Sequence, residues 1–335
     1  MSELQVETIR DKAALAGLAP AWRDLWARAG ATPFQAPEWL LPWWDVFHPG
    51  ALAAFAVWNG PALVGLGPLY VEDGPHGRRL LPVGISLSDH VDVLLDPSCA
   101  QAAAGAMAEA VARLGLPLQF VDLAPGTSGW RLPLPAGWFE QRGEGEPCPV
   151  LALSPGPEDG GGLPVCIPAA RRRKVRMARH RAERRGEVHV ERCGPEQSHT
   201  FLCLLSRLHG ARWRDRGEAG VLDDDRVQQF HRAAASGLLG AGLAEALVLR
   251  IGGVVAGCYY GLKDASRSYA YIGGFDPEFA RESPGAILLG QAIGDAARRG
   301  SVEFSFLRGA EAYKYEWGAQ DRHNGWRLLA PSGHG

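Results

Sequence analysis

The sequence lacks the paired cysteines and histidines that hold structural zinc. Its six cysteines form no C-x-x-C pair, and its ten histidines form no H-x-x-x-H pair. Zinc sites in proteins take closely spaced ligand pairs of these kinds. We therefore expect free, mostly buried thiols and no metal site.

The sequence also lacks an unbroken apolar run long enough to cross a membrane. The longest stretch without Asp, Glu, Lys or Arg runs from Val46 to Val71. Turn residues at Pro49-Gly50, Asn59-Gly60-Pro61 and Gly67-Pro68 interrupt it, which predicts two strands around a turn. The first ten residues carry charges where a signal peptide needs an apolar core. We therefore expect a cytoplasmic protein without membrane insertion.

A serine nucleophile elbow is missing as well. The nearest stretch, Gly84-Ile-Ser86-Leu-Ser88, lacks the last glycine of the G-x-S-x-G pattern. A reaction through a covalent enzyme intermediate of that kind is therefore not expected.

The composition is that of an ordinary soluble protein. The chain has 335 residues, 46% hydrophobic and 21% charged, and a formal net charge of -2. The 43 glycines and 24 prolines stay below the roughly 25% share typical of disordered chains. At about 150 residues per domain, this length predicts two domains.

The second half shows a clear order of strand and helix patterns, β-α-α-β-β-β-α-β-α-β. The strands are expected at Glu187–Cys193, Ala244–Ile251, Val254–Leu262, Arg267–Phe275, Val302–Leu307 and Gly325–Ala330. The helices are expected at Pro195–His209, Asp223–Leu239, Ser283 to near Gly300, and Ala310–Trp317.

The first half repeats much of this order more loosely. Strands are expected at Leu4–Ile9, Leu52–Trp58, Leu63–Val71, His90–Leu95 and Leu118–Leu123, and helices at Lys12–Ala29, Pro37–Phe47 and Ser98–Leu114. We therefore predict an α/β fold of the α+β kind with two copies of one unit, at residues 1–165 and 166–335. Each unit is expected to contain a mixed, largely antiparallel sheet flanked by helices.

One helix start could bind an anion. Ser283-Pro284-Gly285 places an N-cap residue and a proline at the start of a helix directly after a strand. Free N–H groups and the positive end of the helix dipole favour a phosphate there, and Gly285 would let it approach closely. Arg281 just upstream could pair with the phosphate or remain solvated. The alternative is an ordinary capped helix.

Six stretches carry a resemblance to a known family. They are TPFQAPEWLLPWW (Thr32–Trp44), ISLSDHVDVLL (Ile85–Leu95), RRRKVRMARHRAERRGEV (Arg171–Val188), LHGARWRDRGEAG (Leu208–Gly220), YIGGFDPEFARESPGAILL (Tyr271–Leu289) and FLRGAEAYKYEWG (Phe306–Gly318). Together with the element order, they resemble the CelD/BcsL-type, or BioF2-like, acetyltransferases, which are tandem-GNAT relatives of the FemAB aminoacyltransferases. At one position, Ser305 in FSFLRG, such relatives commonly carry Asp.

The resemblance implies tandem GNAT-like domains, with acyl-coenzyme A as co-substrate bound by the C-terminal domain. The strand before the central helix would splay. The backbone N–H groups of Tyr271, Ile272 and Gly273 would polarise the thioester carbonyl, and the helix start at Ser283 would receive the pyrophosphate. The clean R/Q-x-x-G-x-G/A signature of typical GNAT enzymes is absent.

A basic run adds a possible partner. Arg171–Arg185 holds nine Lys or Arg against one acid, which gives a local net charge of +8. It could be a solvated helix face, a phosphate-binding patch for coenzyme A or a phosphorylated substrate, or a tRNA surface as FemAB relatives suggest. Unpaired RNA bases usually stack on aromatic residues, and none lies between Ala169 and Glu191, so tRNA ranks third.

Two further residues are candidates for proton transfer. Asp89 stands just before an apolar strand and could serve as general base for an amine, or could simply cap a turn. His209 lies near the end of its helix, four residues before Trp213, and could be a base or a substrate contact, or could be structural. Trp213 is a candidate substrate contact.

The segment after the strand Val302–Leu307 would lie near the open edge. Its candidates are Arg308 and Glu311 as substrate contacts and Tyr313 and Lys314 as catalytic residues. Lys314 could hold a carboxylate or phosphate, and Tyr313 or Tyr315 could protonate the leaving thiolate. The alternative is a helix that packs its tyrosines and Trp317 inward and exposes Lys314.

We therefore expect an N-acyltransferase that moves an acetyl or longer acyl group from coenzyme A to an amine, or a hydroxyl, by direct attack. One alternative is a FemAB-like enzyme that takes its acyl group from aminoacyl-tRNA. Another is a non-catalytic relative that serves as a scaffold in polysaccharide biosynthesis or export, and Ser305 keeps this alternative open.

Overall fold

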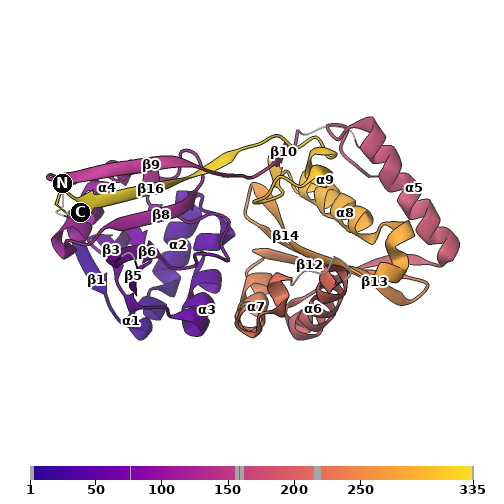
Figure 1. The fold of residues 1–335 in the computed structure, drawn as a ribbon, viewed down its shortest axis with the longest axis horizontal. Helices are drawn as coiled ribbons and strands as arrows, with labels where there is room; N and C mark the ends of the chain where they lie inside the picture. Colours follow the sequence, from indigo (N-terminus) through magenta and orange to yellow (C-terminus); the bar gives the residue numbers. More distant parts are fainter. Residues whose placement is uncertain (1–3, 76, 155–157, 159–161, 215–219, 334–335) are drawn as a thin grey trace. The chain divides into compact units, whose positions relative to one another are not determined.

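The computed structural model describes residues 4–75, 77–154, 158, 162–214 and 220–333, with the side chains of 212–214 left out. The chain divides into two compact units (Figure 1). Unit 1 comprises Met1–Glu146 and His323–Gly335, and unit 2 comprises Pro147–Arg322. No helix in the described part of the chain is both long enough and apolar enough to cross a membrane.

Unit 1 contains two sheets, with strand orders β1-β3-β4-β7 and β2-β5-β6-β8-β16-β9. The strands are β1 (Gln5–Ile9), β2 (Ala51–Leu52), β3 (Ala54–Asn59), β4 (Ala62–Gly67), β5 (Leu69–Gly74), β6 (Gly77–Pro82), β7 (Leu94–Leu95), β8 (Leu118–Leu123), β9 (Trp138–Pro147) and β16 (His323–Pro331). The helices are α1 (Lys12–Gly17), α2 (Ala19–Ala29), α3 (Pro37–Phe47) and α4 (Ala100–Leu114).

Unit 2 contains one six-stranded sheet, with the order β10-β15-β14-β13-β12-β11. The strands are β10 (Val150–Ala152), β11 (Val188–Cys193), β12 (Ala244–Ile251), β13 (Val254–Lys263), β14 (Arg267–Phe275) and β15 (Glu303–Ser305). The helices are α5 (Ala169–Arg185), α6 (Ser198–Arg214), α7 (Asp225–Gly240), α8 (Pro284–Arg298) and α9 (Ala312–Tyr315). Neighbouring strands run antiparallel except β14 and β15, so the predicted mixed, largely antiparallel sheet flanked by helices is confirmed.

The two faces of this sheet carry different helices. In Figure 1, α8 and α5 lie on one face, and α6 and α7 lie on the other. Two glycines permit the close packing. A Cβ at Gly257 would lie 3.1 Å from atoms of Leu288 and Pro284 at α8, and a Cβ at Gly274 would lie 2.5 Å from the backbone nitrogen of His209 in α6.

The core of unit 2 lies between α8 and the sheet. Helix α8 buries its apolar side chains at helical spacing, including Ile287, Leu288 and Ile293, against Leu247 and Leu249 of β12. Each fully buried side chain of this size contributes about 1.5–3 kcal/mol. This packing fixes the position of α8 relative to β14.

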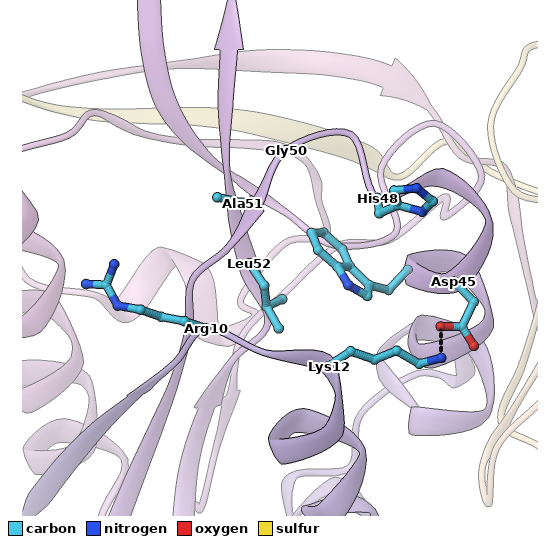
Figure 2. A pocket seen from close by; sticks show the side chains of 8 residues that line it. Arg10, Lys12, Asp45, His48, Gly50, Ala51 and Leu52 are labelled. Atoms are coloured by element: carbon cyan, nitrogen blue, oxygen red, sulfur yellow. Dashed lines mark ion pairs between the residues drawn. The ribbon is translucent and has the colours of Figure 1, made fainter.

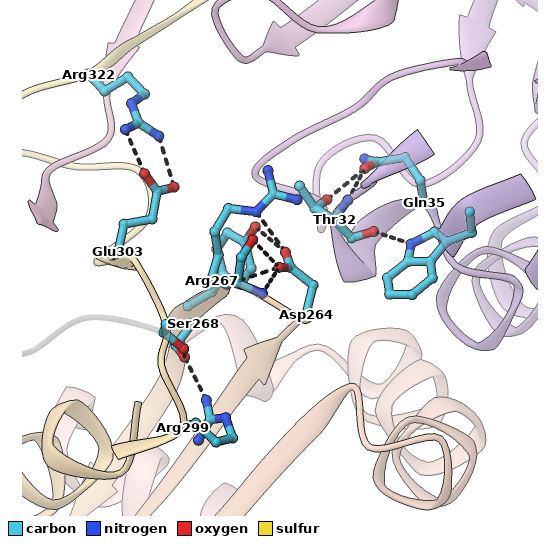
Figure 3. Close-up of polar contacts among 12 residues, drawn as sticks. Thr32, Gln35, Asp264, Arg267, Ser268, Arg299, Glu303 and Arg322 are labelled. Atoms are coloured by element: carbon cyan, nitrogen blue, oxygen red, sulfur yellow. Dashed lines mark hydrogen bonds and ion pairs between the residues drawn. The ribbon is translucent and has the colours of Figure 1, made fainter. Parts of the chain in front are cut away.

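A polar network holds the start of β14. The carboxylate of Asp264 accepts hydrogen bonds from the backbone N–H of Ser266 and Arg267, from Arg267 Nε at 2.8 Å and from the Tyr269 hydroxyl at 2.8 Å. Figure 3 shows this cluster, together with the contact of Arg299 with Ser268. The turn between β13 and β14 therefore sets where β14 begins.

The unit boundaries differ from the predicted 1–165 and 166–335. The last strand, β16, was expected to complete the second copy, but it pairs antiparallel with β8 of unit 1. In unit 2, β10 lies beside β15 instead. The segment 124–170, for which no strand was predicted, contains the ten-residue strand β9 as well as β10. Strand pairing at this distance along the chain leaves no local pattern from which the boundary could be predicted.

Two other elements differ in the first half. The predicted helix Lys12–Ala29 is two helices that meet at Leu18. The predicted strand His90–Leu95 shortens to β7, because the Asp92 carboxylate accepts hydrogen bonds from the N–H groups of Ser128 and Gly129. Asp89 therefore lies in a loop and not at the start of a strand.

Candidate functional site

Strands β14 and β15 separate after three residue pairs. Their parallel pairing joins Arg267–Tyr269 to Glu303–Ser305 and ends there, whereas β14 continues to Phe275. Within the described residues, no strand pairs with the rest of β14 on this side. The predicted splay is therefore present, and it leaves backbone hydrogen-bonding groups available along one edge of β14.

A bulge in β14 coincides with this splay. Tyr260 of β13 pairs with Ile272, and the next residue, Gly261, pairs with Ala270, so Tyr271 is the extra residue. A bulge of this kind bends a strand and redirects its side chains. The Tyr271 ring consequently contacts His231 of α7 at a ring-centre distance of 5.5 Å and Tyr260 at 6.0 Å.

Helix α8 begins beside the separated edge. Its N-cap is Ser283, at φ 52°, and Pro284 occupies the first helical position, as the sequence predicts. The Ser283 side chain makes no capping hydrogen bond. A Cβ added at Gly285 would meet no atom within 4 Å. The positive end of the α8 dipole therefore faces open space, where an anion would be favoured.

These elements enclose a cavity of about 320 Å³. It is lined by Arg171, Cys258, Tyr259, Ala270, Tyr271, Ile272, Gly273, Gly274, Phe275, Gly285, Ala286, Leu288, Leu289 and Tyr313. Five predicted site residues, Tyr271, Ile272, Gly273, Gly285 and Tyr313, therefore lie around one cavity. Arg281 lies just before α8 and is exposed, and its carbonyl accepts a hydrogen bond from Arg181 Nε at 2.7 Å.

His209 contacts the backbone of the separated strand. Its Nδ1 lies 3.2 Å from the carbonyl oxygen of Gly273, and the side chain is buried. Since a carbonyl can only accept, Nδ1 carries the proton in this contact. His209 therefore positions a peptide group that lines the cavity.

Comparison with known proteins bears on the fold that carries this cavity. Residues 169–315 match the family described as "Acetyltransferase (GNAT) domain". The matched residues lie in unit 2, which we call the GNAT unit after this match. Over the whole chain, the crystal structure of FemX is similar at a TM-score of 0.67 and 13% identity, covering 96% of both chains. A conserved protein of unknown function from Bacteroides thetaiotaomicron VPI-5482 has a TM-score of 0.58 at 10% identity, covering 97% of this chain and 100% of its own. No curated protein matches the sequence.

Lys314 of the GNAT unit is buried, whereas the alternative sequence interpretation exposed it. Its ammonium donates to the carbonyl oxygens of Leu307, Arg308 and Gly309 at 3.1, 2.6 and 3.0 Å. Glu311 lies 2.9 Å away. An ammonium has three N–H donors, so none remains for a substrate carboxylate or phosphate. In this structure Lys314 and Glu311 hold the loop after β15, and their assignment as catalytic and substrate-binding residues stays a prediction.

Other predicted residues of the GNAT unit lie as follows. Ser305 ends β15, and its hydroxyl accepts a hydrogen bond from the Leu307 N–H at 3.2 Å. Tyr315 donates to Asp321 at 2.7 Å, which raises the pKa of its hydroxyl; of the two tyrosines considered as proton donors, Tyr313 lines the cavity and Tyr315 does not. Arg308 is half-buried. The Trp213 side chain lies outside the described residues.

Asp89 lies in unit 1 and does not line this cavity. Its carbonyl accepts a hydrogen bond from the Asn324 amide at 2.8 Å, and the residue is buried. Its assignment as general base stays a prediction.

The sequence interpretation did not identify several of the residues that line the cavity. Arg171 was one cation among nine, and no local signal separates it from its neighbours. Tyr259, Leu288 and Leu289 carry only the periodicity of core residues. Their position on the cavity wall depends on how α8 packs against β13 and β14.

A second cavity, of about 590 Å³, lies in unit 1. Arg10, Lys12, Trp44, Asp45, His48 and Leu52 are among the residues that line it (Figure 2). Lys12 and Asp45 form an ion pair at 2.5 Å, which neutralises both charges. The sequence interpretation contained no signal for this cavity.

A buried histidine gives the GNAT unit a predicted pH dependence. Burial lowers the pKa of His231 to about 3, compared with about 6.5 when unfolded. Protonation therefore favours the unfolded chain, and stability is lost as pH falls from about 6.5 toward 3. Between pH 7.5 and 5 we expect the free energy of unfolding to fall by about 2 kcal/mol because of this residue.

Urea unfolding of the wild type and of His231→Phe at the two pH values measures this contribution. The variant should lose about 2 kcal/mol less than the wild type on acidification. Equal losses in the two proteins would contradict the assignment.

Proposed function

We propose that the GNAT unit binds an acyl-coenzyme A and transfers its acyl group to an amine by direct attack. The observation that supports this most is the cavity between the separated edge of β14 and the uncapped start of α8. An elongated donor with an apolar arm and a charged end needs a cavity for the arm and a site that favours its charge. The cavity along β14 suits the arm, and the start of α8 suits the charge. The domain match indicates acyl transfer as the general class of reaction. The proposal names a donor, acyl-coenzyme A, and an acceptor, an amine, for that reaction.

The residues present fit such a donor. The open space at Gly285 and the dipole of α8 suit a pyrophosphate, and the exposed cation of Arg281 lies one turn upstream. The edge of β14 from Ala270 to Phe275 offers backbone groups to the amides of the pantetheine arm. Apolar side chains of Leu288 and Leu289 complete the wall.

The chemistry requires polarisation of the thioester carbonyl and two proton transfers. Backbone N–H groups of Tyr271–Gly273 would stabilise the oxyanion as the amine nitrogen bonds to the carbonyl carbon. The carbon–sulfur bond then breaks, and the thiolate takes a proton from the Tyr313 hydroxyl. Water or a carboxylate removes the amine proton. His209 keeps the Gly273 peptide in position.

Titration calorimetry tests the donor. We expect micromolar binding of acetyl-CoA, butyryl-CoA or a long-chain acyl-CoA to the full chain, with the preferred chain length defining the acyl group. A thiol assay with an amine panel then follows release of coenzyme A. Absence of binding by every thioester would overturn the proposal.

A second candidate is transfer from aminoacyl-tRNA. It is supported by the fold shared with FemX over 96% of the chain and by the exposed cations of α5, including Lys174 and Arg179. Phosphate contacts make such binding strongly salt-dependent. Tight, salt-sensitive tRNA binding without thioester binding would favour it, and absence of both would favour the scaffold alternative.

A further inference from the structure

Arg171 differs from the other cations of the basic helix. Its side chain is 12% exposed, whereas Lys174 is 63% and Arg179 is 50% exposed. The guanidinium carbon lies 4.2 Å from the ring centre of the buried Trp317. Nη1 donates to Glu316 Oε2 at 2.7 Å. Arg171 is therefore held in one orientation by stacking and by an ion pair.

The Arg171 guanidinium has N–H groups that donate to no acceptor among the described residues. It carries five N–H groups, and Glu316 accepts from one nitrogen, Nη1. Nε is buried and has no hydrogen-bond acceptor among the described residues. A ligand atom has no open position beside this buried Nε, so the donors available to a ligand are the two N–H groups of Nη2, which makes no hydrogen bond among the described residues.

The surroundings of Arg171 indicate what that ligand contains. Arg171 is the charged residue among the described residues that line the cavity, and the other lining side chains are apolar or aromatic. The hydroxyl of Tyr259 already donates to the Tyr269 carbonyl at 3.4 Å. A cation that is fixed in an apolar wall makes ligand binding selective. A ligand without an oxygen at the matching position leaves the cation without a partner and binds less tightly.

We propose that Arg171 is a specificity-determining residue that donates a hydrogen bond to an oxygen of the ligand in this cavity. The acceptor is a carboxylate or carbonyl oxygen on the acyl group, or an amide carbonyl on the pantetheine arm. This inference rests on the proposed function and deepens it, since it states a chemical requirement for the donor.

Two thioesters that differ in one carboxylate test the proposal. Succinyl-CoA and butyryl-CoA have four-carbon acyl groups, and only the first ends in a carboxylate. Calorimetry on the full chain should show wild type binding succinyl-CoA at least tenfold more tightly, and Arg171→Met binding both within twofold of each other. Lys174→Met is the matched control, since Lys174 contacts the same Glu316 carboxylate but does not line the cavity. It should retain the wild-type preference.

Free coenzyme A distinguishes the two sources of the oxygen. If Arg171→Met weakens coenzyme A, butyryl-CoA and succinyl-CoA equally, by at least tenfold, while Lys174→Met does not, the acceptor belongs to the pantetheine arm. Arg171→Lys serves if the methionine variant does not fold. It keeps the charge but lacks the planar guanidinium with its terminal N–H groups, and its affinity should fall at least fivefold.

The proposal is overturned if Arg171→Met, or Arg171→Lys in its place, binds all three compounds within twofold of wild type. Failure of the wild type to bind these three compounds, acetyl-CoA and a long-chain acyl-CoA overturns the proposed function itself. The two failures are therefore distinguishable.

Discussion

Gly285→Trp is expected to lower the affinity for acyl-coenzyme A by at least 100-fold. The indole would extend from the first turn of α8 into the open space that a Cβ at Gly285 enters without contact. That space is where we place the donor's phosphates. A 100-fold loss corresponds to about 2.7 kcal/mol, comparable to losing several contacts between phosphates and N–H groups.

The variant should fold, because a tryptophan in an exposed first turn is compatible with a helix. Gly105→Trp is the matched control. It also replaces a helical glycine with open space around its Cβ, but lies in α4 of unit 1. Calorimetry should show normal binding by this control. Unchanged binding by Gly285→Trp would show that the α8 start is not the phosphate site.

Gly274→Ala should destabilise the protein by about 3 kcal/mol. Its Cβ would lie 2.5 Å from the nitrogen of His209 and 2.8 Å from the carbonyl carbon of Leu208. Both are backbone atoms, so α6 must move away from β14 as a whole. Overpacking of this kind typically costs about 1–3 kcal/mol. We expect the upper end of this range for Gly274→Ala, because the backbone of α6 cannot move aside as a flexible side chain can.

The adjacent glycine provides the control. A Cβ at Gly273 projects to the other face of β14, and its nearest contact is the Cys258 carbonyl oxygen at 3.6 Å, an ordinary distance. Gly273→Ala should cost less than about 1 kcal/mol. Urea unfolding followed by tryptophan fluorescence measures both variants. Equal losses would contradict the proposed role of Gly274.

Gly274→Ala also bears on the site. Moving α6 displaces His209 from the Gly273 carbonyl, so the variant should weaken thioester binding even in the folded state. The two glycines thus separate the packing function of one face of β14 from the binding function of the other.

Elements defined by local signals were predictable from the sequence. The bounds of β12 and β14 agree with the predicted strands, because turn residues enclose each apolar run. The start of α8 at Pro284 also agrees with the prediction, because the helix-start signal of Ser, Pro and Gly acts within one turn. The predicted mixed α/β architecture and the residues around Gly285 follow from such signals.

Long-range pairing was not predictable. Strand β16 follows α9 directly in sequence, yet pairs with β8, about 200 residues earlier. Nothing in its alternating pattern specifies which edge it joins, since any sheet edge satisfies an amphipathic strand. The same limit applies to the separation of β14 from β15, which depends on where a distant strand stops.

The sequence by itself determined the bounds of β14 and the start of α8, two elements that line the cavity of unit 2. Only the tertiary structure decided which cations take part. In the tertiary structure Lys314 is buried and donates to three carbonyl oxygens, whereas Arg171 of the basic helix α5 lines the cavity. The physical reason is that a side chain's chemistry is encoded locally, whereas its burial and partners come from elements packed far apart in the chain.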